Sequence, residues 1–507
     1  MKMNNRIIPA IILFILIMLS CQQKQINPST GQFSSSADIG NVKNVGLTVY
    51  DADNQSYTIN GSGTNMWFGE DEFHYLWLPM QGDFILRAEA EFIGQGAEPH
   101  RKMGWMIRNE TATGSAHVNA CVHGDGLTSL QFRRTEGADT EEIRSRDSLP
   151  DVIQLERRGN TYIMSTSIFG KPFTKVLVDS IFLQDEVLAG LYVCAHNPDV
   201  VEKAVFRNVR IIKPAWDSLV PYRDYLGSHL EVLDIQTGLR KILMTVPFSI
   251  QAPNWTTDGK KLIYNSKGLL YGYDLETGDT AMINTGFANN NNNDHVLSFD
   301  GKSLAISHHR EEDNGQSTVY ILPAEGSSGP VQITSGGASY LHGWSVDGSH
   351  LLFTGQRNGQ FDIYRISIET KEETQLTNTE GLDDGPEYSP DGKYIYFNSN
   401  RTGTMQIWRM LPDGSGLEQL TFDRYNDWFP HVSPDNEKIV FVTFPEDVPS
   451  GDHPFYKHVM IRMMPVTGGE PEIIAYVYGG QGTMNVPSWS PDSKKIAFIS
   501  NTGLLKK

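Results

Sequence analysis

The stretch GPEYSPDGKYIYFNSNRTGTMQIWRM, residues 385–410, decides the fold, because its first half returns as FPHVSPDNEKIVFVTF from residue 429. Within it, SPDG suits a type I turn position by position, with serine first, proline with its fixed φ second, aspartate third and glycine fourth. The runs KYIYFNS and MQIWRM are short, apolar and rich in β-formers, so they predict strands. The repeat therefore predicts a unit of short strands joined by tight turns.

The same unit occurs six times along the chain. Its aspartates are Asp258, Asp300, Asp347, Asp391, Asp435 and Asp492. A period in the forties with four strands per unit is typical of a propeller blade. The last unit lacks its third and fourth strands, but a matching pair, LEVLDIQTGLRKILM, precedes the first unit from Leu230. We therefore expect a six-bladed β-propeller over residues 230–503, closed by pairing N- and C-terminal strands so that no sheet edge stays open.

Residues 45–214 show strand alternation without this period. In DFILRAEAEF, residues 83–92, apolar and charged side chains alternate as in a half-buried strand. Further short strands of the same kind predict an antiparallel β-sandwich. The segment 215–229 would connect the sandwich to the propeller, and the whole chain is predicted to be all-β.

The first residues differ in kind from the rest. Lys2 and Arg6 precede an apolar run over residues 7–19, which is shorter than the ~20 residues that a membrane-spanning helix needs. Residues 1–21 therefore read as a signal peptide. Its end, MLSC, resembles the bacterial lipobox, with Met18 in place of the usual leucine, which implies lipidation at Cys21. An uncleaved anchor with a chance cysteine is the alternative. The polar residues 22–44 predict a flexible tether.

Composition excludes several functions. A net charge of -18 repels phosphate backbones, so nucleic acid is not an expected partner. The sequence contains no GxSxG, HExxH, GxxxxGK[ST] or CxxC motif, which leaves serine hydrolase, zincin, P-loop and thiol redox chemistry without local support. Cys121 and Cys194 lie in strand-like runs and could form a disulfide or remain buried thiols.

The residues just before each repeat should meet at one mouth of the propeller channel, because all the loops into the innermost strands open on the same face. Histidine with carboxylate there suits a divalent metal or an acid and base pair. The candidate catalytic residues are His295, His342, His431 and Glu387, and the same three histidines are the candidate metal ligands. The candidate ligand-binding residues are Asn254, Asp294, Asp383, Asp384, Asp427 and Asn485. Local Asx turns and backbone hydrogen bonds are the alternative roles.

Three arginines follow the second strands of successive blades. Arg310, Arg357 and Arg401 lie in SHHREEDNG, GQRNGQ and NSNRTG. Guanidinium groups beside the mouth would suit a uronate or another carboxylate ligand. Bonding to neighbouring blade loops is the alternative.

The SPDG(K)xIxF and SxRxGxxxIW patterns resemble the C-terminal propeller of the periplasmic TolB family. Oligogalacturonate lyases use a related propeller with a histidine-rich metal centre in its mouth, and this resemblance implies a divalent metal ion there. In the N-terminal part, GWMIRN, HVNACVHGDGLTSLQFRR and LAGLYVCAHN look like a concanavalin-like sandwich, which implies contact with carbohydrate.

Together these features predict a lipid-anchored protein of the bacterial cell envelope, facing the periplasm or the surface and touching the membrane only through its anchor. Its propeller and sandwich would bind a glycan or an envelope protein without catalysis. A polysaccharide-degrading lyase or hydrolase, with the mouth histidines at its centre, is the first alternative. A TolB-like scaffold of an envelope transport complex is the second. The sequence leaves open whether the protein is an enzyme.

Overall fold

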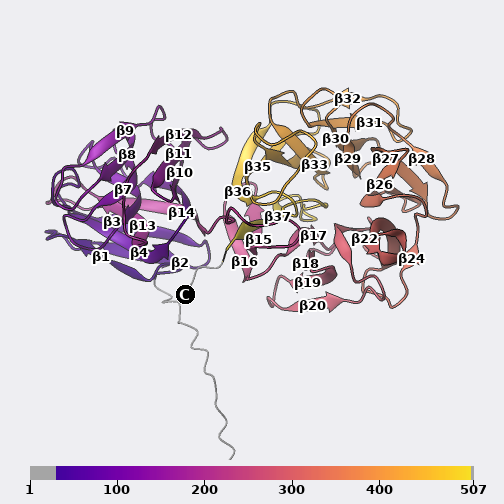
Figure 1. The fold of residues 1–507 in the computed structure, drawn as a ribbon, viewed down its shortest axis with the longest axis horizontal. Helices are drawn as coiled ribbons and strands as arrows, with labels where there is room; N and C mark the ends of the chain where they lie inside the picture. The colour runs from indigo at the N-terminus through magenta and orange to yellow at the C-terminus, as the bar shows by residue number, and fades with distance from the viewer. Residues whose placement is uncertain (1–29, 504–507) are drawn as a thin grey trace, which may run out of the picture.

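The computed structural model describes residues 30–503, which form a sandwich beside a propeller (Figure 1). The predicted signal peptide and Cys21 lie outside these residues. Within them the one helical segment is a 3-10 turn, η1 (Glu311–Asp313), and every other regular element is a strand. Over this described range, no helix reaches the length and apolarity that crossing a bilayer requires. The all-β prediction is confirmed.

Two seven-stranded antiparallel sheets form the sandwich. The first contains, in sheet order, β1 (Ser35–Ile39), β4 (Phe73–Gln81), β13 (Glu186–Cys194), β6 (Lys102–Arg108), β7 (His117–His123), β8 (Thr128–Arg133) and β9 (Glu141–Arg144). The second contains β12 (Thr174–Val178), β11 (Thr161–Ser167), β10 (Val152–Arg158), β5 (Phe84–Phe92), β14 (Glu202–Ile212), β3 (Ser56–Gly61) and β2 (Leu47–Asp51). Apolar side chains from both sheets, Trp105 and Phe206 among them, form one core. Cys121 and Cys194 are buried and free.

The expectation of a tether over residues 22–44 is wrong in its second half. Strand β1 lies within that range and pairs with β4 from Ser35 to Ile39. The Asp38 carboxylate accepts hydrogen bonds from the Gly46 backbone and from Nδ1 of His74, the latter at 2.7 Å. Polar composition suggested a solvated segment, but these polar groups are satisfied within the sheet.

The propeller contains five four-stranded blades and one three-stranded blade. The four-stranded blades begin with β17 (Gln251–Trp255), β18 (Lys261–Ser266), β19 (Leu269–Asp274) and β20 (Thr280–Ile283), followed by β21 (Asn291–Leu297), β22 (Ser303–Arg310), β23 (Gln316–Pro323) and β24 (Val331–Gln332). Next come β25 (Ser339–Trp344), β26 (His350–Arg357), β27 (Gln360–Ser367) and β28 (Glu373–Gln375), then β29 (Asp383–Tyr388), β30 (Ile395–Ser399), β31 (Gln406–Met410) and β32 (Glu418–Gln419). The fifth contains β33 (Asn426–Val432), β34 (Lys438–Phe444), β35 (Lys457–Pro465) and β36 (Glu472–Gly479).

The remaining blade closes the ring as predicted. It joins β16 (Arg240–Val246) and β15 (Gly227–Asp234) to β37 (Lys495–Thr502), and a bridge from Trp489 to Ile496 supplies its innermost position. Because the first and last strands of the propeller share one sheet, the six blades form a continuous ring (Figure 1).

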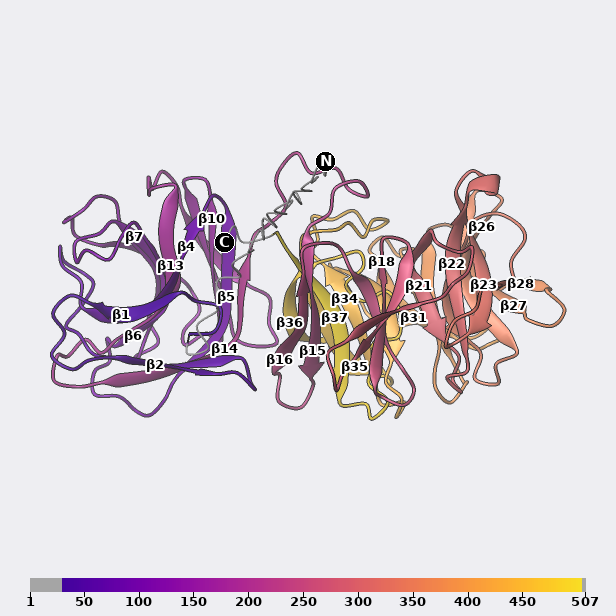
Figure 2. The same ribbon diagram turned by 90° about the horizontal axis from the view of Figure 1, so that it is seen from below.

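The sandwich packs directly on the propeller, beside its closing blade (Figure 2). Arg87 of β5 donates from Nη1 to the backbone oxygen of Tyr476 in β36, at 2.5 Å. Ile85 and Ile212 of the sandwich share an apolar cluster with Tyr478 of the propeller. The charged face of β5, expected to meet solvent, is therefore partly covered by the second unit.

A buried ion group joins the two units at the same place. Glu231 of β15 is 0% exposed and accepts from Arg210 of β14 at 2.6 Å and from Arg240 of β16 at 3.0 Å. Ser500 of β37 donates to the same carboxylate. Burial raises the pKa of Glu231, but the two guanidinium groups outweigh that effect and hold the pKa below its usual range. The carboxylate therefore stays ionised inside the joint.

Candidate functional site

A cavity of about 980 Å³ opens at the propeller mouth, where the first residues of the innermost strands meet. Its aromatic lining consists of Tyr222, Tyr225, Phe248, Tyr340, Phe361, Phe429 and Phe455. Its amide lining consists of Gln251, Asn265, Asn290, Asn291, Asn292, Asn293, Gln481 and Asn485. The two tyrosines from the connector pack edge-on against Phe455, with ring centroids 5.3 and 5.9 Å away. The connector between the units is therefore part of the cavity wall.

An ionisable group of three lies in this cavity. His342 Nε2 is 3.1 Å from Asp384 Oδ1, which also accepts from Thr354 at 2.7 Å. Burial lowers the pKa of His342, but the bond to Asp384 and the charges of Asp384 and Asp294 raise it above its usual value overall. Burial raises the pKa of Asp294 to about 6, with His342 acting against that shift. The histidine is thus held toward its charged form beside one ionised carboxylate.

The predicted metal centre does not assemble. Within residues 30–503, one group of at least three histidine, cysteine or acidic side chains has its donor atoms within 4.8 Å of one another. That group contains none of His295, His342 and His431. His295 is 0% exposed and directs Nε2 to the Ile263 backbone oxygen at 3.2 Å. Burial lowers its pKa to about 4. Of the three histidines, only His342 lines the cavity.

The predicted acid and base pair of His431 and Glu387 is present as a contact but lies outside the cavity lining. His431 Nδ1 is 2.6 Å from Glu387 Oε2, and its Nε2 is 3.2 Å from the Met484 backbone oxygen. Glu387 also accepts from the backbone of Val432. Both ring nitrogens are engaged, so this pair joins two blades, and the sequence-based catalytic role is not supported by its position.

The predicted ligand-binding residues divide in two. Asp294, Asp384 and Asn485 line the cavity. Asn254, Asp383 and Asp427 do not. Their side chains bond the Pro487 backbone oxygen, Arg401 and Arg462 respectively.

The three predicted arginines also lie outside the cavity lining. Arg357 pairs with Glu373 at 2.9 Å, Arg401 with Asp383 at 2.8 Å, and Arg310 approaches Glu312 at 2.6 Å. These contacts stay within each blade or its adjoining turn. Lys267 is the one lysine or arginine in the lining, so the expected guanidinium site for a uronate is not built here.

The sequence interpretation missed several lining residues. His309, His453, Tyr340 and Phe361 belong to strand ends and loops that the repeat does not mark. One signal was available, because five consecutive asparagines, residues 289–293, precede Asp294. Such a run is unusual for the start of a buried strand, and four of its members line the cavity.

Comparison with known proteins bears on the propeller. The family model described as the TolB beta propeller domain matches residues 313–448. The chain is 46% identical over 276 residues to Atu1656 of Agrobacterium fabrum strain C58, an uncharacterized protein. That match spans 54% of this chain and 92% of the relative. A solved structure from Agrobacterium tumefaciens, provisionally designated TolB, is 44% identical with a TM-score of 0.53, covering 55% of this chain and 100% of that one. TolB from Acinetobacter baumannii is 17% identical with a TM-score of 0.41, covering 64% and 79%.

Proposed function

This chain belongs to the TolB-like β-propeller family, and from that premise we propose that it is a binding protein of the bacterial cell envelope. It would hold a segment of a partner polypeptide in the cavity at the propeller mouth, without chemistry of its own. The observation that carries the proposal is the cavity lining, which combines aromatic rings with side-chain amides.

That lining suits a peptide. An asparagine or glutamine side chain offers both a donor and an acceptor, so a ring of them can pair with successive peptide groups. Tyrosine rings are enriched where protein interfaces gain most of their free energy. The volume of about 980 Å³ lies at the upper end of the range for ligand pockets. With Asp294 and Asp384 in the wall and no arginine, a polyanionic ligand is disfavoured.

We extend the proposal to location. The leader-like start and the cysteine at position 21 support export and a lipid anchor, with the sandwich and propeller outside the inner membrane. The family model lies within the propeller, at residues 313–448. Any role of the sandwich in carbohydrate binding belongs to the same proposal and rests on its resemblance to concanavalin-like domains.

A second candidate function is favoured by one observation. The contact between His342 and Asp384, beside an Asp294 carboxyl with a raised pKa, has the composition of an acid and base centre in a cleft. A glycan-cleaving enzyme would use these residues in place of the predicted His295 and His431.

Site-specific photo-crosslinking tests the binding proposal. A photoreactive phenylalanine analogue at Phe361, in the cavity, should give a discrete polypeptide adduct in living cells. The same analogue at Phe422, an exposed ring outside the lining, serves as the matched control and should give none. The adduct at Phe361 should also weaken when Tyr340 is replaced by alanine.

The outcomes separate the two candidates. No polypeptide adduct at Phe361, or equal adducts at both positions, would contradict the binding proposal. Glycan cleavage that disappears in His342→Gln and Asp294→Asn while the protein stays folded would establish the enzyme instead.

A further inference from the structure

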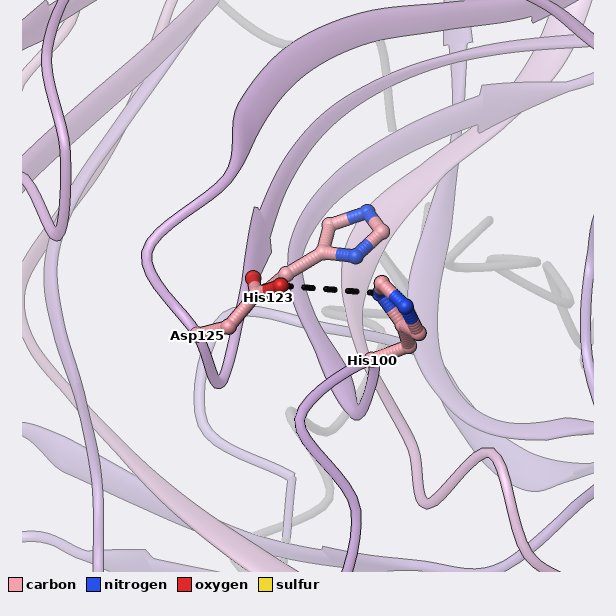
Figure 3. Close-up of side chains that lie close together, drawn as sticks. All are labelled: His100, His123 and Asp125. Carbon is pink, nitrogen blue, oxygen red and sulfur yellow. Dashed lines mark ion pairs between the residues drawn. The ribbon is translucent and has the colours of Figure 1, made fainter.

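We propose that the sandwich carries a site for a divalent transition metal ion of the zinc class, formed by His100, His123 and Asp125 (Figure 3). This site is in a different domain from the cavity and does not depend on what the cavity binds. The three donor atoms lie within 4.8 Å of one another. Among the described residues, this is the one group of three histidine, cysteine or acidic side chains whose donor atoms come this close.

The backbone holds these three residues in place. His123 ends β7, Asp125 lies in the turn that follows, and His100 lies two residues before β6. The turn is tied to the neighbouring loop by two backbone hydrogen bonds, from Gly124 to Arg101 at 2.9 Å and from Asp125 to Pro99 at 2.8 Å. The ligands therefore come from two adjacent, mutually bonded loops.

The spacing of the donors fits a metal ion. His100 Nδ1 is 3.7 Å from Asp125 Oδ2. Ligand atoms that lie ~2.0–2.2 Å from a tetrahedral zinc ion are about 3.4 Å from each other. In Figure 3 the ring nitrogen of His123 next to its Cβ-bearing carbon, Nδ1, faces His100. A small adjustment of exposed side chains would bring all three onto one ion.

His123 supplies an independent indication. The residue is 4% exposed, and its Nδ1 has no hydrogen-bond partner. A buried polar atom left unpaired is costly, and such atoms are rare in folded proteins. Coordination to a metal ion would satisfy this nitrogen.

Neighbouring groups orient the ligands as expected around a metal. Asp125 Oδ1 accepts from the Leu127 backbone at 3.0 Å, which leaves Oδ2 for the ion. His123 Nε2 lies 3.2 Å from the Gln131 side-chain amide, whose Oε1 is also unpaired. With metal on Nδ1, the Nε2 proton of His123 would point at the Gln131 amide, and a flip of that amide would place Oε1 there as its acceptor.

Two imidazoles and one carboxylate are ligands that zinc and similar ions prefer, whereas calcium and magnesium prefer oxygen alone. The side chains of His100 and Asp125 are 51% and 37% exposed, so a fourth position opens to solvent. His196, whose ring centroid is 5.6 Å from that of His100, is the next imidazole outward. Lys102 Nζ lies 3.5 Å from His196 Nδ1, and its positive charge repels a bound cation. We therefore expect micromolar rather than tighter affinity for the metal ion.

Zinc titration of the purified full-length chain, free of any polyhistidine tag and stripped with chelator, tests the site. The wild-type protein should bind about one equivalent of zinc ion. His100→Ala and Asp125→Asn should each weaken binding at least tenfold. Both changes are at exposed side chains, and asparagine keeps the Oδ1 acceptor of the turn. His350→Ala, in the propeller, is the control and should bind as the wild type does.

A second readout separates ligation from general loss of structure. Cobalt bound at this site should give visible absorption that His100→Ala removes, while circular dichroism stays unchanged. A tenfold excess of calcium should not displace the zinc. Absence of zinc binding in the wild type, or undiminished binding in both His100→Ala and Asp125→Asn, would overturn the proposal.

Discussion

Asp294 gives the cavity a dependence on pH, because burial raises the pKa of its carboxyl to about 6 from an ordinary value near 3.8. Between pH 3.8 and pH 6, the Asp294 carboxyl is mostly ionised in the unfolded chain but still mostly protonated in the folded protein. The contribution of Asp294 to stability is therefore complete below pH 3.8 and is lost as pH rises through 6. Asp294→Asn removes this titration. We expect its free energy of unfolding, relative to wild type, to improve by about 2 kcal/mol between pH 4 and pH 7.

Urea unfolding at several pH values between 4 and 7 measures this difference. If the free energy of unfolding changes with pH in the same way for the wild type and for Asp294→Asn, the carboxyl of Asp294 is not held protonated by its surroundings.

Lys102 is the residue that limits the proposed metal site. Its Nζ lies 3.5 Å from His196 Nδ1, so its positive charge disfavours any cation nearby. Lys102→Met keeps most of the buried side-chain volume and removes the charge. We expect zinc affinity to rise by between threefold and tenfold, measured by the same titration. Unchanged or weaker affinity would mean that the ammonium does not face the bound ion.

Blade strands could be predicted from the sequence because their turns are made by local chemistry. In the quoted stretch, the Ser389 hydroxyl donates to Asp391 Oδ1 at 2.7 Å, and the Ser389 backbone bonds Tyr394 across the hairpin. Ser433 and Asp435 repeat the first contact. A pattern whose cause lies within six residues can be read without knowing the rest of the fold.

The cavity residues could not be predicted as well, because β-bulges reset the direction of side chains. His295 and His342 each lie five residues before the repeat aspartate. In β21 the pairing shifts between Asn291 and His295, whereas in β25 it shifts between Leu341 and Gly343, around His342. A single extra residue, as in β25, turns the following side chains to the other face, whereas two extra residues, as in β21, do not. His342 therefore lines the cavity and His295 does not.

At the level of strands, β37 is the element that closes the ring. The Ala497 backbone donates to the Ser488 oxygen at 2.9 Å, in the interior of the closing sheet. Ala497→Pro would remove that donor, so we expect a loss of about 3 kcal/mol or more and a tendency to aggregate through the freed edges. Ala497→Gly keeps the donor and should cost about 1 kcal/mol. Thermal unfolding with size-exclusion chromatography distinguishes them, and equal losses in both variants would contradict the role of this bond.

The molecule as a whole is held together at the joint around Glu231. Arg210 reaches this carboxylate from the sandwich and Arg240 from the propeller. Glu231→Gln would leave two buried guanidinium groups without their direct ion-pair partner, at a cost of about 3 kcal/mol. We expect calorimetry to show the sandwich and propeller unfolding together in the wild type and separately in the variant.

The pH dependence of the joint has the opposite sign to that of Asp294. Because the folded pKa of Glu231 is depressed, its stabilisation is present above its ordinary value of 4.5 and is lost as pH falls. Acid should therefore mimic the Glu231→Gln change. Glu91→Gln, at a solvent-exposed pair with Arg207, is the matched control and should cost less than about 1 kcal/mol. A single, unsplit transition in Glu231→Gln would rule out this joint as the coupling element.

The closing blade also sets an order of events during synthesis. Its register pairs Gly227 with Thr502 and Asp234 with Lys495. All the strands of the sandwich precede residue 213, so that domain can fold while the propeller is still being made. The ring cannot be completed until residue 502 is available, and the preceding blades wait with two unpaired edges. A newly made chain therefore passes through a stage in which unpaired strand edges are exposed to chaperones and proteases. That stage ends when β37 pairs with β15.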